Sequence, residues 1–333
     1  MTSYCSLFVD AGYLMAAAST RVTGTSLRGA TDMDVPGLLG DLTAQVQADS
    51  GLPLLRIHWY DAGTRTGAPS PVQREIAKLP RVKLRLGRSG YNGEQKGVDL
   101  KLALDLIGQS RNGVAEVVYL ISGDDDLSEA VEAAQDLGVQ VIALVVPDEA
   151  DSAIAVSQHL QMTVDRMEFI AAGSIEARVR RCSSASYDLA NSPPSLALVP
   201  DLTGDSEAGT RTADRPTPLL VSQARPLAAI RPVPSVRSVP AYVSSSNGYY
   251  LNSLADSVVD EAISYVVEKV VQNLFRGAPE ESRADLLKGR PFIPPEVDRT
   301  LLTDLSNKLG IYDLPQEPRF ALRDAFWSAV AKQ

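Results

Sequence analysis

The chain has 333 residues, of which 44% are hydrophobic and 22% are charged, and it carries a formal net charge of −9. This length allows about two domains, and the composition is ordinary for a soluble globular protein. With only two cysteines, a disulfide framework and a thiolate zinc site are excluded, and a cytoplasmic protein is expected. The chain has no N-terminal export signal and no long uncharged apolar stretch, so we expect no membrane span.

The net charge argues against tight, nonspecific DNA binding, because nucleic-acid-binding domains are usually basic. The distribution of charge is uneven, however. The segment 74–96 holds seven basic residues and two acidic ones. An acidic protein that binds a metal through carboxylates can carry such a local basic track, so RNA stays a candidate partner.

The first half of the chain alternates strand and helix patterns. Apolar, β-branched runs predict strands at 4–10, 54–61, 82–87, 114–122 and 139–146. Apolar spacing with a 3.6-residue period predicts helices at 34–49, 71–79, 98–110 and 127–137. Asp34 is expected to cap the first of these helices, and Gly138 to end the last. The alternation predicts an α/β domain over 1–175, with a mostly parallel sheet flanked by helices.

The composition changes after Cys182. Serine and proline dominate the segment 183–250, which predicts a flexible linker. Helical periodicity returns over 251–333 and predicts a small, mainly helical domain. Because the linker lacks apolar content, we expect the two halves to be independent. The last segment holds 10 basic and 13 acidic residues, so contact with a protein partner is as plausible there as RNA binding.

Acidic residues occupy the positions at which an α/β sheet exposes its functional edge. Asp10 ends the first predicted strand, Asp124 follows the fourth, and Asp99 lies in the first turn of the helix at 98–110. If these two strands are neighbours, the three carboxylates converge outside the carboxyl ends of the strands. A lone aspartate at a strand end is usually a cap, so the convergence is what indicates a site. Hard oxygen ligands favour Mg²⁺ or Mn²⁺ over zinc.

Three segments of the chain resemble the signature segments of NYN domains, which are PIN-like nucleases. The segments are 8–14, 96–99 with Asp105, and 122–127. The resemblance covers residues 4–172 and implies a ribonuclease that hydrolyses RNA phosphodiester bonds as an endonuclease. It also implies that Asp10, Asp99, Asp124 and Asp126 are the catalytic and metal-binding residues. Asp125 fills a variable position and is expected to face solvent. The segment 251–333 weakly resembles helical or winged-helix domains that accompany some NYN proteins.

One position departs from the family pattern. Tyr13 stands where the family commonly has asparagine, and a tyrosine cannot replace an amide carbonyl as a ligand. A catalytically inactive module that binds RNA or protein therefore stays an alternative. A phosphatase of the haloacid dehalogenase type also places an aspartate after its first strand. It needs a second aspartate two residues later, where this chain has Gly12.

The basic track suggests how an acidic protein contacts a polyanion. Side chains alternate along a strand, so Lys83 and Arg85 share one face of the predicted strand at 82–87. Lys96 follows shortly before Asp99. We expect these three basic residues to bind RNA. The other interpretation is an edge strand whose charges block aggregation, and it stays open.

Overall fold

The structure is a computed structural model, and it describes residues 3–64, 66–89, 95–182, 256–276, 280–311 and 314–332. The segments 1–190 and 247–333 belong to one compact unit. The predicted linker at 183–250 lies outside the described residues. No helix in the described ranges is long and apolar enough to cross a membrane.

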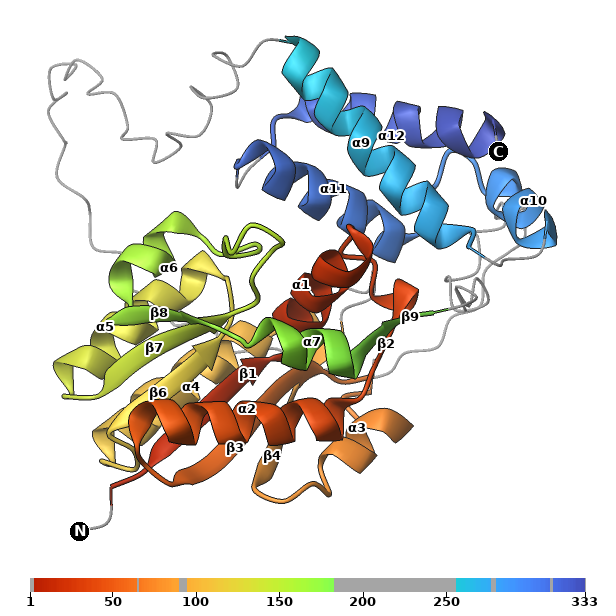
Figure 1. Cartoon of the computed structure of the whole chain (residues 1–333). Coiled ribbons are helices and arrows are strands. Elements are labelled where there is room, and N and C mark those ends of the chain that lie inside the picture. The colour runs from red at the N-terminus through yellow and green to blue at the C-terminus, as the bar shows by residue number, and fades with distance from the viewer. Residues whose placement is uncertain are drawn as a thin grey trace, which may run out of the picture. The chain divides into compact units, whose positions relative to one another are not determined.

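A seven-stranded sheet forms the centre of the first half, in the order β5-β4-β3-β1-β6-β7-β8 (Figure 1). Its strands are β1 (Cys5–Asp10), β3 (Leu54–Ala62), β4 (Val82–Ser89), β5 (Gln95–Lys96), β6 (Val117–Ile121), β7 (Gln140–Val145) and β8 (Arg166–Phe169). Neighbouring strands are parallel, except that β4 and β5 are antiparallel. The predicted mostly parallel sheet is confirmed, and β1 and β6 are neighbours as the convergence of aspartates requires.

Helices cover both faces of this sheet (Figure 1). One face packs against α1 (Ala11–Thr23), α2 (Val35–Ser50) and α7 (Ala172–Arg178). The other face packs against α4 (Val98–Arg111), α5 (Ser128–Asp136) and α6 (Gln158–Thr163). Because both faces are covered, β6 is apolar throughout, whereas β1 and β3 also contain polar residues such as Ser6 and His58. A short helix, α3 (Pro71–Ile76), connects β3 to β4, and a small antiparallel pair joins β2 (Thr31–Met33) to β9 (Val179–Arg181).

The ends of the helices follow from particular residues. Asp34 caps α2 by accepting a hydrogen bond of 3.0 Å from the backbone N–H of Gly37. Gly138 follows α5 with a φ of +83°, a conformation that side chains disfavour. Both predictions are confirmed. No sequence pattern predicted α1, which begins after its cap Asp10 and ends before Gly24.

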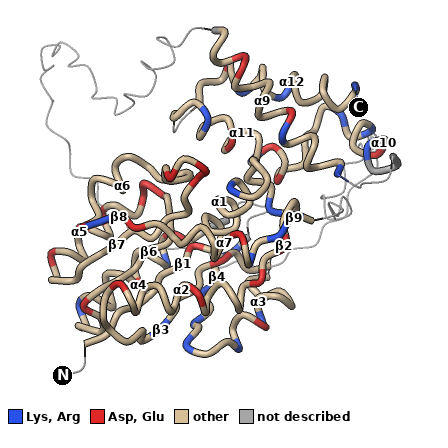
Figure 2. Tube along the Cα trace, viewed as in Figure 1, with Lys and Arg blue, Asp and Glu red and all other residues tan. Residues whose placement is uncertain are grey.

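The last segment is helical in the residues that the structure describes there. It contains α9 (Asp256–Leu274), α10 (Glu280–Lys288), α11 (Pro295–Leu309) and α12 (Gln316–Lys332). The predicted mainly helical character is confirmed, and the described part of this segment has no strand that would make a wing. Figure 2 shows acidic and basic positions interspersed along the described helices and strands.

The two halves are not independent in the folded chain, in contrast to the expectation. Leu27 and Ala30 belong to the same apolar cluster as the buried side chains of α9, α11 and α12. Asp304 on α11 accepts hydrogen bonds from the Thr25 hydroxyl at 2.7 Å and from the Ser26 backbone N–H at 3.0 Å. The apolar side chains that make this contact come from the segment after α1, so the composition of the linker gave no information about it.

Candidate active site

Asp10 lies where β1 passes into α1, at the carboxyl end of the central strand. Its carboxylate accepts a hydrogen bond of 2.8 Å from the backbone N–H of Gly12, which caps the helix. Burial, together with the negative charge of Asp99, raises the pKa of Asp10 to about 6. A cap alone does not need such an environment, since most capping aspartates face water. The position therefore resembles a ligand site more than an ordinary helix cap.

Two further aspartates lie at the same edge of the sheet. Asp99 is in the first turn of α4, and Asp124 follows β6 and caps a short 3₁₀ helix over Asp125–Leu127. Burial is the main cause that raises the pKa of both carboxyl groups. The charge of Asp126 raises both pKa values as well, although Asp126 itself is exposed.

The four predicted acidic ligands are thus brought into one electrostatic neighbourhood. Asp99 interacts with Asp10, with Asp124 and with Asp126. Arg28 offsets the charges of this cluster only in part, by lowering the pKa of Asp10, so the cluster favours either protonation or a bound cation. Within the described ranges, no three potential ligands stand close enough to hold a metal ion as the side chains are placed. The donor set consists of carboxylate oxygens, which suit a hard divalent cation.

Close packing explains why residue 123, directly after β6, is a glycine. A Cβ atom at Gly123 would lie 1.9 Å from the backbone oxygen of Ala155 and 2.8 Å from the ring of Tyr13. Only glycine lets the loop after β7 approach β6 this closely. The loop is also held by the backbone N–H of Ser157, which donates to the Gly123 oxygen at 2.9 Å. This contact fixes the backbone from which Asp124 projects.

Tyr13 also contacts the loop after β7. Its hydroxyl donates a hydrogen bond of 2.9 Å to the backbone oxygen of Ile154, so it binds the loop after β7. The Ser122 hydroxyl accepts a hydrogen bond of 3.3 Å from the backbone N–H of Asp124. Tyr13 therefore has a structural role at the position where the family commonly has asparagine.

Asp125 contacts the loop after β7, although its charge also raises the pKa of Asp124. Its carboxylate accepts a hydrogen bond of 2.9 Å from the Ser157 hydroxyl, and His159 Nδ1 lies 3.4 Å from the same oxygen. About 40% of the Asp125 side chain is exposed. These contacts explain why Asp125, between two predicted ligands, anchors the loop instead.

Arg28 is a neighbour of the cluster that the sequence analysis did not identify. Its guanidinium donates a hydrogen bond of 3.1 Å to the backbone oxygen of Gly12, and its charge lowers the pKa of Asp10. It follows α1 in a short 3₁₀ helix over Arg28–Ala30. No motif marks this arginine, because only the turn after α1 brings it back beside Asp10.

The three predicted RNA-binding residues lie in different environments. Lys83 on β4 is exposed, and no ion pair of its side chain occurs among the described residues. Arg85 is ion-paired with Asp105 on α4, at 2.8 Å between Nε and Oδ2. Lys96 lies in β5, where its backbone pairs with Arg88, and its side chain lies outside the described residues.

Comparisons with known proteins identify the family. An uncharacterized protein of Sinorhizobium fredii, y4oD, is 32% identical over 145 residues, which are 41% of this chain and 64% of that protein. The chain thus spans somewhat less than two thirds of this relative's length. A crystal structure of a protein of unknown function from Vibrio parahaemolyticus shows 19% identity and a TM-score of 0.35, over 51% of this chain and 93% of that one. The family model described as NYN domain matches residues 5–175. The chain belongs to the NYN domain family, whose members are generally PIN-like nucleases.

Proposed function

We propose that this chain is a divalent-metal-dependent ribonuclease that cleaves internal phosphodiester bonds of RNA. The observation that carries the proposal is the group of three partly buried aspartates at the carboxyl edge of β1 and β6, with raised pKa values and mutual repulsion. Membership of the NYN domain family supports the same reaction class. The substrate, the metal and the cleavage activity are all parts of the proposal.

Asp10, Asp99 and Asp124 would hold Mg²⁺ or Mn²⁺, with Asp126 as a fourth ligand. When bound, the ion activates water and neutralises charge that develops on the phosphate. Arg28, beside Asp10, is placed to attract the anionic backbone towards the edge. The hydrogen bonds from the Gly12 N–H to Asp10 and from the Asp126 N–H to Asp124 orient the two carboxylates.

Lys83, Arg85 and Lys96 are proposed to contact RNA phosphates. Of the three, Lys83 is the best candidate for a phosphate contact, because its ammonium is exposed and has no ion-pair partner among the described residues. Asp105 neutralises much of the charge of Arg85. An exchange of that pair for a phosphate would release Asp105, so Arg85 contributes less to affinity than Lys83.

A second candidate function is a catalytically inactive module that binds RNA or a protein. The specific observation in its favour is Tyr13, whose hydroxyl is bound to the Ile154 backbone and offers no ligand in place of the family's asparagine. The last helical segment would then provide a contact for a protein partner.

The test is incubation of the pure protein with structured and unstructured RNAs in Mn²⁺, Mg²⁺ or EDTA. We expect cleavage with either ion, none in EDTA, and none by Asp124→Asn, which keeps the shape of the side chain and loses its charge. Asp125→Asn is the matched control, because it removes the same charge from the neighbouring residue and should keep most activity. Full cleavage by Asp124→Asn, or by the wild-type protein in EDTA, would contradict the proposal.

A further inference from the structure

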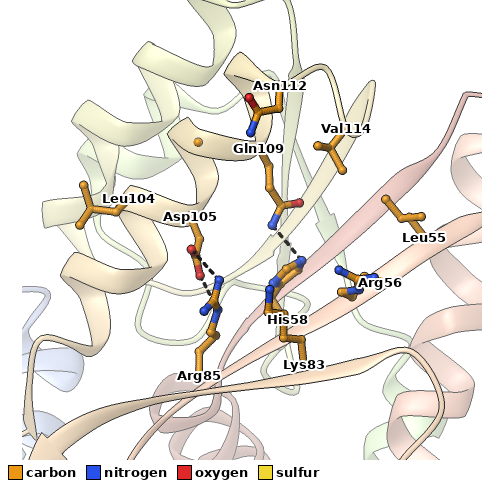
Figure 3. A pocket seen from close by; sticks show the side chains of 11 residues that line it. Leu55, Arg56, His58, Lys83, Arg85, Leu104, Asp105, Gln109, Asn112 and Val114 are labelled. Atoms are coloured by element: carbon orange, nitrogen blue, oxygen red, sulfur yellow. Dashed lines mark hydrogen bonds and ion pairs between the residues drawn. The ribbon is translucent and has the colours of Figure 1, made fainter.

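A second site lies on the α4 face of the sheet, next to the candidate active site and separate from its aspartates. Figure 3 shows Arg56, His58 and Lys83 on the strands, facing Gln109 on the helix above them. Together with Leu104 and Gly108 of α4, these residues line a cavity of about 290 Å³, which we call the basic pocket. Its volume lies near the lower end of the range for ligand sites.

The basic pocket contains cations without a protein counter-ion. Arg56 and Lys83 are exposed, and neither forms an ion pair among the described residues, whereas neighbouring Arg85 is paired with Asp105. Burial is the main cause that lowers the pKa of His58 to about 4, and the charges of Lys83 and Arg56 also lower it. The imidazole is therefore neutral at physiological pH, and the net positive charge of the pocket comes from the two exposed side chains.

The deep end of the basic pocket has polar groups that lack partners. His58 is 2% exposed, and its Nε2 lies 2.8 Å from Nε2 of Gln109. His58 Nδ1 and Gln109 Oε1 are buried and have no hydrogen-bond partner in the described part of the chain. Whichever way the amide is turned, one ring nitrogen and one amide group stay unpaired. Buried groups of this kind cost free energy until a partner supplies the missing hydrogen bonds.

A glycine keeps the basic pocket open. Gly108 lies inside α4, where glycine is less favourable than other residues. A Cβ atom at this position would meet no atom within 4 Å, so packing of the helix does not require the glycine. The space beside Gly108 is the pocket itself. A side chain at 108 would therefore begin in open space and extend into the pocket, and this makes the site testable.

The register of the sheet places the basic pocket relative to the aspartates. Asp10, Tyr60 and Arg85 form one row across β1, β3 and β4, and Phe8, His58 and Lys83 form the next row on the same face. Two strand spacings and two residues therefore separate Lys83 from Asp10, which is roughly 12 Å. A single strand of RNA with a phosphate at the aspartates reaches the pocket with a nucleotide further along the strand than its nearest neighbour.

We propose that the basic pocket binds one nucleotide of single-stranded RNA, on the strand that leads away from the phosphate at the aspartates. Arg56 and Lys83 contact the phosphate, and the amide of Gln109 and the ring of His58 bind the edge of the base. Single-stranded RNA is recognised in this way, through phosphate contacts and hydrogen bonds to exposed base edges. The location of the pocket along a substrate strand rests on the proposed ribonuclease function, whereas the binding itself is measured without cleavage.

The experiment measures binding of fluorescent oligoribonucleotides to the full-length protein in EDTA. We expect an octanucleotide to bind more tightly than a dinucleotide, because only the longer strand reaches the pocket. Gly108→Leu fills the pocket and should weaken octanucleotide binding about tenfold, with little effect on the dinucleotide. Arg56→Gln with Lys83→Gln should lower the slope of log affinity against log salt by about 0.7, because the two side chains contact one phosphate and each neutralised phosphate of a single strand accounts for about 0.7.

Lys332→Gln, at the exposed end of α12, is the control for the removal of a charge and should bind like the wild type. Unchanged octanucleotide affinity in Gly108→Leu, with its fold intact by circular dichroism, would overturn the subsite. The absence of RNA binding by the wild type would also overturn it. Adenosine monophosphate and inorganic phosphate are added as competitors. If a free mononucleotide binds as tightly as the octanucleotide and Gly108→Leu abolishes that binding, the pocket serves a free nucleotide and the subsite is refuted. Wild-type protein that binds as expected in EDTA and does not cleave in Mn²⁺ would refute only the proposed function.

Discussion

Asp10 and Asp304 are two buried carboxylates in different parts of the chain, and burial raises the pKa of each to about 6. Their surroundings differ. Asp304 accepts hydrogen bonds from Thr25 and from Ser26, and no other carboxylate raises its pKa. Asp10 has Asp99 as a neighbour of like charge.

The comparison teaches that a raised pKa by itself does not identify a catalytic residue. Perturbed pKa values occur at functional sites and in structural contacts alike. What distinguishes Asp10 is repulsion from a second carboxylate, which a bound cation would relieve and a protein donor does not. Asp304 has the donors that a structural carboxylate needs. The predictions below test whether the two residues separate in this way.

The largest expected difference is in RNA cleavage. Asp10→Asn should lower the cleavage rate at least a thousandfold, because the loss of one charged ligand removes several kcal/mol of stabilisation from the transition state. Asp304→Asn should cleave at close to the wild-type rate. Rates are measured on a fluorescent single-stranded RNA in Mn²⁺. A rate for Asp10→Asn within tenfold of the wild type would place the metal elsewhere.

The next difference concerns stability. Asp304→Ala leaves the Ser26 N–H and the Thr25 hydroxyl without an acceptor and should lower the free energy of unfolding by about 3 kcal/mol. Urea unfolding followed by circular dichroism measures this loss. Asp298→Ala on the same helix removes an ion pair with Arg323 that is partly exposed, and it should cost less. Equal losses in both variants would mean that the buried hydrogen bonds of Asp304 stabilise the fold no more than a partly exposed ion pair does.

A metal should stabilise one of these regions and not the other. At a free Mn²⁺ concentration a hundredfold above the dissociation constant, the wild-type protein should gain about 2.7 kcal/mol of stability. Asp304→Asn should show the same gain, whereas Asp10→Asn should lose most of it. Thermal unfolding with and without Mn²⁺ provides the measurement. If Mn²⁺ stabilises Asp10→Asn as much as the wild type, Asp10 is not a metal ligand.

Asp304 should also make the stability of the folded chain depend on pH. Its pKa is about 6 in the folded chain against an ordinary value of 3.8, so the folded state holds a proton between about pH 4 and pH 6 that the unfolded state has released. The free energy of unfolding therefore falls as the pH rises through this window. Asp304→Asn removes this contribution and should be more stable than the wild type at pH 7, by about 3 kcal/mol, because the two pKa values differ by about two units. The advantage should disappear below about pH 4. A pH profile of unfolding parallel to that of the wild type would show that the carboxylate is charged at no cost.

The sequence predicted the parts of the fold that depend on local patterns. The apolar runs located β1, β3, β4, β6 and β7, and capping residues such as Asp34 and Gly138 located helix ends. The missed helix α1 is rich in alanine, and its apolar residues spread around the helix, so no period marks it.

What depends on distant contacts was not predictable in the same way. The aspartates of the candidate site could be found because strand ends in a parallel sheet share one edge. Arg28 and Asp304 are different, because their partners Gly12 and Thr25 meet them only through tertiary packing. In the sequence, Asp304 lies on the apolar stripe of its helix, seven residues after Val297 and three after Leu301, but nothing there marks its partners.

The strand order has a consequence for the chain as it is synthesised. β1 is central in the sheet, and its neighbour β6 begins only at Val117. Asp10 emerges from the ribosome early, but Asp124 is made more than a hundred residues later. Domains form as units while synthesis proceeds from the N-terminus. A growing chain therefore lacks the complete set of carboxylates until most of this domain exists, and a truncated product that ends before β6 would carry Asp10 and Asp99 without Asp124.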